Sequence, residues 1–247
     1  MFGYTAQQTL DAVQEMYEQK LVTYPRTDSQ YLTDEMGEST EALIQMLTGK
    51  LPFAKEMKIQ PDVKKVLNSK KVSDHHAIIP TMEVKKADLE SLKERNRKIL
   101  YLISARVLMA TADSYIYESH KCQITCNYHT FYLSARKVKQ EGFRTIEKQL
   151  KQFFGVKAEK EEAELDIWEG KHYGPCDAFV TEHDTQPPKQ YTEDTLLSAM
   201  ERAGNEELTE DTEKKGLGTP ATRAAIIEKP DPVRLCEAGE EKSGPYQ

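Results

Sequence analysis

The spacing of apolar residues changes near Ser114, and this change restricts the possible folds most. Before it, apolar residues recur every three or four positions, which is typical of amphipathic helices. From Ser114 to Arg144 they alternate with polar residues in segments broken by polar turns, which predicts antiparallel strands. We therefore expect an α+β fold in which a mainly helical part precedes a strand-rich part.

Capping and stop signals give the helices approximate limits. We expect helices over residues 5–19, 33–49 and 92–110, and another over 192–200 with Thr192 as its N-cap. The residues expected to face a core are Leu43, Met46, Leu47, Ile99, Leu100, Ile103, Val107, Ala110, Leu196, Leu197 and Met200.

These patterns divide the chain into four regions. Residues 1–113 form the mainly helical domain, and residues 114–185 form the strand-rich segment, in which the charged stretch 157–164 is a hairpin tip or linker. A Gln-Pro-Pro boundary then opens residues 186–229, the start of a second helical domain. Residues 230–247 are poor in apolar side chains, and we expect them to be poorly ordered.

Composition excludes some classes of protein. No apolar run approaches the roughly 20 residues of a membrane-spanning helix, and no secretory signal is evident, so we expect a cytoplasmic protein without a membrane partner. The net charge of -7 argues against a uniformly basic surface for nucleic acid. A local positive groove is still compatible with the lysines at positions 64, 65, 70 and 71.

The cysteines do not form a recognisable framework. Their spacing fits neither paired zinc ligands nor a disulfide scaffold, so we expect free thiols in a reducing compartment. Cys122 and Cys126 lie four residues apart on one strand face, where packing is favoured over metal binding. The other two are Cys176 and Cys236.

A short segment around Tyr24 holds the strongest chemical signal. Tyrosine ionises only near pH 10, so a nucleophilic tyrosine needs neighbours that stabilise negative charge. Arg26 supplies a permanent positive charge with a planar fork that suits two phosphate oxygens, and Pro25 stiffens the backbone between them. From the residues alone, a hydrogen-bonded surface turn is the alternative interpretation.

Two further segments are candidates for binding. His75 and His76 suggest a metal, but adjacent side chains in an extended segment point to opposite faces, so no metal site is expected there. A buried, hydrogen-bonded histidine is the ordinary alternative. Gly216–Arg223 predicts a turn into a helix, with Thr219 as N-cap and Pro220 in the first helical position. Such a helix start can bind phosphate or can be purely structural.

Three ordered segments give the chain a family resemblance. LVTYPRTDSQYLTDEM, HHAIIPT and GLGTPATRAAII resemble the corresponding motifs of type IA DNA topoisomerases, and QPPKQYTEDTLLSAME resembles the family sequence before the third motif. The proline after Tyr24 is more similar to the topoisomerase III branch. The resemblance extends over nearly the whole chain as far as Lys229.

The resemblance implies a function and a set of roles. Tyr24 would attack single-stranded DNA to form a 5′-phosphotyrosyl intermediate, after which the enzyme passes a strand and reseals the break without ATP. Arg26 would position the phosphate and stabilise its charge, and His75 would be a further phosphate ligand. Thr219, Thr222 and Arg223 would hold single-stranded DNA by its backbone. Such an enzyme would be associated with the nucleoid.

The family pattern also includes parts without a counterpart here. The resemblance implies an N-terminal Toprim domain that binds magnesium, so we expect the isolated chain to be inactive alone. The sequence after Lys229 departs from the family, and a shift of reading frame is one hypothesis for this tail. The alternative functions are a non-catalytic module that binds single-stranded DNA and, less favoured, an interaction domain with chance motifs.

Overall fold

The computed structural model describes residues 2–55, 57, 59–157, 169–170, 174, 179–204 and 216–228. Contacts divide the chain into two compact units, each of which is described by itself. The first comprises Met1–Gly3 with Asp11–Gln190, and the second comprises Tyr4–Leu10 with Tyr191–Gln247.

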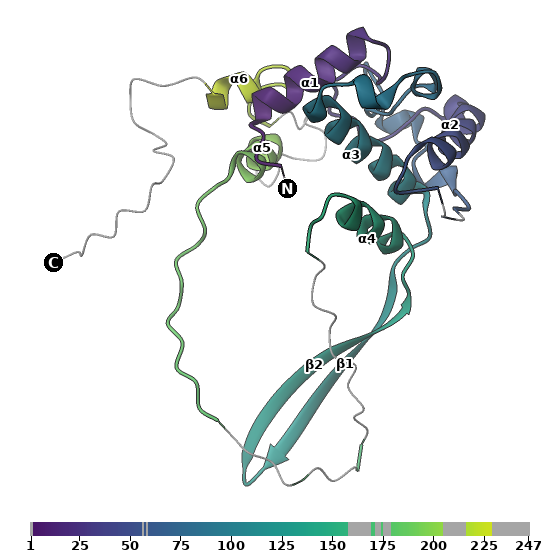
Figure 1. Cartoon of the computed structure of the whole chain (residues 1–247). Coiled ribbons are helices and arrows are strands. Elements are labelled where there is room, and N and C mark those ends of the chain that lie inside the picture. The colour runs from purple at the N-terminus through teal and green to yellow at the C-terminus, as the bar shows by residue number, and fades with distance from the viewer. Residues whose placement is uncertain are drawn as a thin grey trace, which may run out of the picture. The chain divides into compact units, whose positions relative to one another are not determined.

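Helices dominate the first unit, as the periodicity predicts (Figure 1). They are α1 (Ala6–Glu18), whose first turn belongs to the second unit, α2 (Gly37–Lys50), α3 (Glu94–Thr111) and α4 (Arg144–Phe153). Five short 3-10 helices lie between them: η1 (Asp34–Met36), η2 (Val63–Lys65), η3 (Ser69–Lys71), η4 (Met82–Lys85) and η5 (Leu89–Ser91). The predictions for α1, α2 and α3 are confirmed to within a few residues.

The core of this unit is centred on α3. Leu100 and Leu108 of α3 are fully buried, as are Met16 of α1 and Leu47 of α2. The prediction of Ala110 as a core residue is wrong, because Ala110 is exposed. The buried face of α3 is wide, but it does not include the position of Ala110. This face is wide because α3 contacts three elements, α2, η2 and α4, rather than a single neighbour. Met46 and Ile103 are half-buried.

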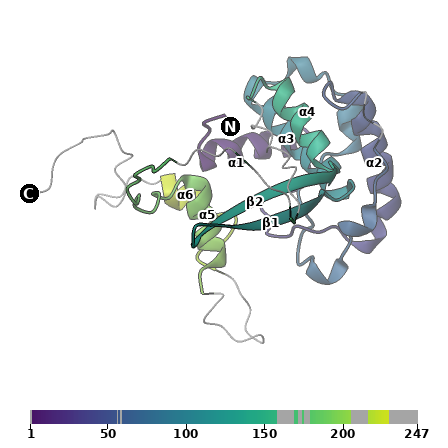
Figure 2. The same cartoon turned by 90° about the horizontal axis from the view of Figure 1, so that it is seen from below.

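Helix α4 was not predicted from the sequence. It packs beside α3 (Figure 2) and buries Ile146 and Leu150, which lie one helical turn apart. An aromatic cluster closes the end of this pair of helices: the rings of Tyr101 and Phe153 are 5.7 Å apart, and those of Tyr101 and Phe53 are 6.0 Å apart.

The alternating segment forms one antiparallel hairpin, which confirms the prediction of strands. β1 (Ile116–Cys126) pairs with β2 (His129–Gln140) in a long twisted ribbon (Figure 1). The two-residue turn places Asn127 and Tyr128 at positive φ, as a type I′ hairpin requires. Cys122 and Cys126 are free thiols on one face of β1, whereas Cys176 and Cys236 lie outside the described residues.

The second unit contains α5 (Glu193–Arg202) and α6 (Arg223–Glu228), which contact each other. Thr192 caps α5 through a reciprocal pair of hydrogen bonds with Thr195, which confirms the predicted N-cap. Leu196, Leu197 and Met200 are half-buried rather than buried.

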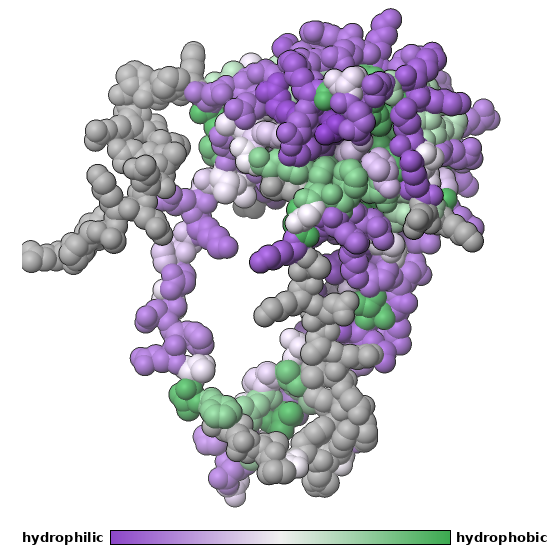
Figure 3. All heavy atoms as spheres, in the orientation of Figure 1, coloured by the Kyte–Doolittle hydropathy of each residue, from purple (hydrophilic) through white to green (hydrophobic). Residues whose placement is uncertain are grey.

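The remaining regional predictions stay predictions. Residues 158–164 of the expected linker and the tail from Pro230 lie outside the described residues, and the domain limits are not tested. None of the described helices is long and apolar enough to cross a membrane. Hydrophilic residues cover most of the face of the helices that Figure 3 shows.

Candidate active site

Backbone hydrogen bonds join the tyrosine segment to the histidine segment. The Thr23 amide donates to the Ile79 carbonyl at 2.9 Å, and the Thr81 amide donates to the Leu21 carbonyl at 2.9 Å. Val22 and Pro80 form an antiparallel bridge between these bonds. Because each segment pairs with the other, two motifs about 50 residues apart in sequence become neighbours.

Threonine side chains add a second set of links. The Thr23 hydroxyl accepts from the Ile79 amide at 2.9 Å and donates to the Ala77 carbonyl at 3.3 Å. The Thr27 hydroxyl donates to the His75 carbonyl at 2.9 Å. A hydroxyl can donate and accept at once, so Thr23 satisfies two backbone groups of the partner segment.

The end of α1 turns the chain into the segment that contains Tyr24. The Lys20 amide donates to the Tyr17 carbonyl and the Leu21 amide to the Met16 carbonyl, both at 2.8 Å. Lys20 has a φ of 60°. This is a Schellman ending with lysine in the left-handed position, and it turns the chain sharply after α1.

Tyr24 lies between two other rings. Its half-buried ring is 5.5 Å from that of Tyr17, in an edge-on arrangement at 80°, and 4.3 Å from that of His75, with the planes inclined by 39°. Tyr17 was not recognised as a site residue, because its contact with Tyr24 depends on the turn after α1. The structure thus brings together Tyr24 and His75, two of the predicted site residues.

Arg26 and His75 present their side chains to solvent. The Arg26 guanidinium forms no hydrogen bond or ion pair with any residue in the described part of the chain. A permanently charged guanidinium with no partner among the described residues, two positions along the chain from Tyr24, is available to an anion.

Ser29 fixes the turn after the tyrosine motif. Its amide donates to the Thr27 hydroxyl at 3.1 Å, and its own hydroxyl donates to the Lys71 carbonyl at 3.0 Å. Asp28 is exposed. These bonds extend the contact between the two segments beyond His75.

His76 is engaged locally. Its ring Nδ1 lies 2.8 Å from the Ala77 carbonyl oxygen and donates a hydrogen bond to it when Nδ1 carries the proton. Among the residues that the structure describes, no group of three or more His, Cys, Asp or Glu side chains could hold a metal ion. The described residues therefore do not fit a magnesium site.

The third motif lies in the second unit and differs from its prediction. Helix α6 begins at Arg223, three residues later than predicted, because residues 220–222 form a turn. Thr219 is therefore not the residue before the helix; its amide donates to the Thr222 hydroxyl at 3.0 Å. Pro220 lies in that turn instead of the first helical position.

The predicted contacts in this motif differ in exposure. Thr219 and Thr222 are exposed, whereas Arg223 is only 8% exposed. The Arg223 guanidinium donates to the Leu217 carbonyl at 3.0 Å and to the Gly218 carbonyl at 3.2 Å. In this conformation Arg223 holds the glycine turn together, and binding of DNA by these three residues stays a prediction.

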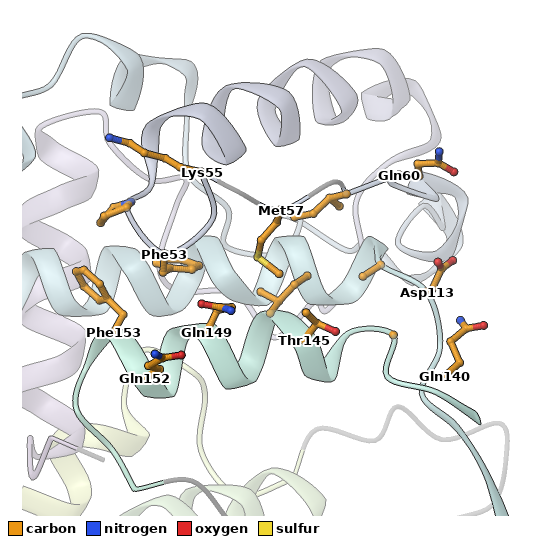
Figure 4. A pocket seen from close by; sticks show the side chains of 15 residues that line it. Phe53, Lys55, Met57, Gln60, Asp113, Gln140, Thr145, Gln149, Gln152 and Phe153 are labelled. Carbon is orange, nitrogen blue, oxygen red and sulfur yellow. The ribbon is translucent and has the colours of Figure 1, made fainter. Parts of the chain in front are cut away.

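An open cleft of about 880 Å³ lies elsewhere in the first unit (Figure 4). It is formed by the loop after α2, the residues that follow α3 and one side of α4. The side chains of Gln149, Gln152 and Phe153 of α4 line it. Tyr24, Arg26 and His75 do not line this cleft. It is therefore separate from the paired segments.

Comparison with known proteins gives consistent matches. A family model described as DNA topoisomerase matches residues 1–231. DNA topoisomerase 3 of Bacillus subtilis is 34% identical over 244 residues, which cover 92% of this chain and 33% of that protein. DNA topoisomerase 3 of Staphylococcus haemolyticus is 34% identical over 236 residues, which cover 90% and 32%. The chain thus spans about a third of the length of these relatives.

The fold of this chain is similar to part of a solved structure. Full-length topoisomerase I from Thermotoga maritima superposes with a TM-score of 0.64 at 24% sequence identity. The match covers 92% of this chain and 34% of that one.

Proposed function

The chain belongs to the type IA DNA topoisomerase family, and on this basis we propose that Tyr24 is the nucleophile that cleaves and rejoins single-stranded DNA. Membership of an isomerase family that changes DNA topology gives the general activity, with DNA as substrate. The observation that carries the specific proposal is the packing of the Tyr24 ring 4.3 Å from that of His75, with Arg26 exposed two residues along the chain and unpaired among the described residues.

The proposed reaction is a reversible transesterification. The Tyr24 oxygen forms a bond to phosphorus while the bond from phosphorus to the 3′ oxygen breaks, which leaves a 5′-phosphotyrosyl link and a free 3′-hydroxyl. The phenol loses one proton and the departing oxygen gains one, so no water or ATP is consumed. The reverse reaction reseals the strand.

Two side chains support this step in the proposal. Arg26 binds the non-bridging phosphate oxygens and stabilises the charge that develops on them. His75 donates a ring N–H to the same phosphate and packs against the ring of Tyr24. In the second unit, the exposed Thr219 and Thr222 contact the DNA backbone, while Arg223 shapes their turn.

We propose that other parts of the whole protein bind the magnesium ion. We place it in a Toprim domain formed by residues other than these 247, as the family resemblance implies. On this view, the isolated chain does not form a covalent adduct. The whole protein works in the cytoplasm in association with the nucleoid.

A chimera tests the proposed function. The matching segment of Bacillus subtilis DNA topoisomerase 3 is replaced by this chain, and the product is incubated with magnesium and a labelled single-stranded oligonucleotide. We expect a denaturation-resistant protein–DNA adduct that is absent in Tyr24→Phe. Tyr128→Phe is the matched control, because Tyr128 is 99% exposed at the hairpin turn.

The outcomes separate the two candidate functions. An adduct that persists in Tyr24→Phe would show that Tyr24 is not the nucleophile. Binding of the oligonucleotide by a folded chimera that never forms an adduct would favour the non-catalytic DNA-binding module. An adduct formed by the isolated chain with magnesium would overturn the proposal that the metal is bound by residues other than these 247.

A further inference from the structure

The ammonium group of Lys71 is held against Tyr31. Its Nζ donates to the Tyr31 hydroxyl at 3.3 Å and lies 4.6 Å from the centroid of the Tyr31 ring. Both contacts restrain a side chain that would otherwise sample many rotamers at the surface. The charge of Lys71 therefore has a preferred position.

The same paired segments that contain Tyr24 and His75 also hold this lysine in place. The Lys71 carbonyl accepts from the Ser29 hydroxyl at 3.0 Å, and the Tyr31 carbonyl accepts from the Ala77 amide at 2.9 Å. Tyr24 and Tyr31 are seven residues apart, so their Cα atoms are separated by at most about 25 Å. Lys71 thus lies within a few nucleotides of the proposed cleavage point.

Within the described part of the chain, no carboxylate neutralises the charge of Lys71. Lys93, Lys98 and Lys148 each pair with a glutamate. No carboxylate in the described residues lies within ion-pair distance of the Lys71 ammonium, and its partner Tyr31 is a phenol. A restrained, exposed positive charge with no counterion among the described residues is suited to an external anion.

We propose that Lys71, positioned by Tyr31, binds a backbone phosphate of the DNA strand that Tyr24 attacks. This inference rests on the proposed function, because that function supplies the anionic strand. Lys71 would bind without regard to base sequence, since a phosphate contact carries no sequence information. Tyr31 acts as a positioning residue through its ring and its hydroxyl.

A binding experiment on the 247-residue chain tests this inference without cleavage. Fluorescence anisotropy is measured with a labelled single-stranded oligothymidylate in the presence of EDTA, between about 50 and 200 mM salt. We expect Lys71→Ala to weaken binding roughly three- to tenfold and to reduce the logarithmic salt slope by about 0.7, the value for one phosphate contact. Lys71→Arg should retain most of the affinity, and Lys71→Glu should bind more weakly than Lys71→Ala.

Variants of Tyr31 examine its positioning role. Tyr31→Phe retains the ring contact and loses the hydroxyl, so it should weaken binding less than Tyr31→Leu, which loses both. Thermal unfolding of each variant shows whether it folds. If folded Tyr31→Leu binds like the unaltered chain, Tyr31 does not position Lys71.

Lys148→Ala is the matched control for charge, because Lys148 is an exposed lysine of α4 that pairs with Glu141. The inference is overturned if Lys71→Ala binds like the unaltered chain, if Lys148→Ala weakens binding equally, or if the unaltered chain does not bind. Adduct formation by the chimera is measured separately. Loss of the Lys71 effect therefore leaves the role of Tyr24 intact, and an inactive Tyr24 leaves the binding result intact.

Discussion

The rings of Tyr24 and His75 lie 4.3 Å apart, centroid to centroid, although the two residues are far apart in sequence. A backbone hydrogen bond from the Thr23 amide to the Ile79 carbonyl, and a side-chain bond from Thr27 to the His75 carbonyl, hold the flanking residues in register. The histidine ring is therefore placed beside the proposed nucleophile by the local fold before any DNA is bound.

Variants of His75 should separate ring packing from hydrogen bonding. We expect His75→Ala to slow adduct formation by the chimera roughly 100-fold, because it removes both the ring and the proposed phosphate donor. His75→Phe retains a ring but has no donor. If His75→Phe is as active as the unaltered chimera, the nitrogen atoms of His75 do not contribute to cleavage.

Thr23→Val should destabilise the junction of the two segments. The substitution keeps the side-chain shape and removes the hydroxyl that joins the Ile79 amide and the Ala77 carbonyl, which should cost about 1–3 kcal/mol. Urea unfolding of the isolated chain measures this change in the free energy of unfolding. Thr23→Ser retains the hydroxyl and should recover part of the loss; equal stability of the Val variant and the unaltered chain would contradict the assigned role.

Two glycine substitutions should have opposite effects on stability. Gly142, with a φ of 49°, has no room for a Cβ atom, which would overlap the carbonyl oxygens of Asp113 and Ser114. Gly142→Ala should therefore destabilise the chain by roughly 1–3 kcal/mol. Gly49 lies in α2, where an added methyl group would meet nothing within 4 Å, and Gly49→Ala should stabilise the chain by about 0.5–1 kcal/mol. Thermal unfolding of both variants checks the difference in sign.

The chain should lose stability in acid partly through Glu15. Hydrogen bonds from Asn96 and then Lys93 hold the pKa of this carboxyl below its ordinary value of 4.5. A folded-state pKa that is lowered gives a contribution that is present above pH 4.5 and is lost as the pH falls through the folded value. Glu15→Gln should unfold more readily at neutral pH and should show a smaller decline below pH 4.5.

Glu41→Gln is the control for the acid experiment, because Glu41 is exposed on α2 and forms no ion pair with a described residue. Unfolding in urea is followed at a series of pH values for the three proteins. A Glu15→Gln profile parallel to that of the unaltered chain would show that this carboxyl does not contribute to acid sensitivity.

Local signals allowed most of the elements to be predicted. The capping residue Thr192 and the alternating pattern of the hairpin both act over a few residues, so their outcome hardly depends on the rest of the chain. Helix α4 has only Ile146 and Leu150 as buried positions in a charged segment, and its stability depends on packing against α3. The apolar residues Ile146, Leu150 and Phe153 do recur at helical spacing, so a local signal for this helix was present and was overlooked.

The candidate site was predictable in its residues but not in its contacts. The motifs identified Tyr24 and His75, whereas the approach of Tyr17 depends on how the chain turns at Lys20. Arg223 illustrates a second difficulty. A guanidinium can donate either to a phosphate or to backbone carbonyls, and only the folded turn shows that the carbonyls of Leu217 and Gly218 accept from it.

The bridge between Val22 and Pro80, with its flanking hydrogen bonds, has a consequence for motion. Tyr24 follows one side of this bridge by two residues, and His75 precedes the other side by five. A displacement that leaves this bridge, the hydrogen bond from Thr27 to His75 and the ring contact intact carries Tyr24 and His75 together. If the proposed enzyme opens a gate while DNA is attached to Tyr24, the two sides of the gate must part elsewhere, and His75 travels with the covalently held strand end.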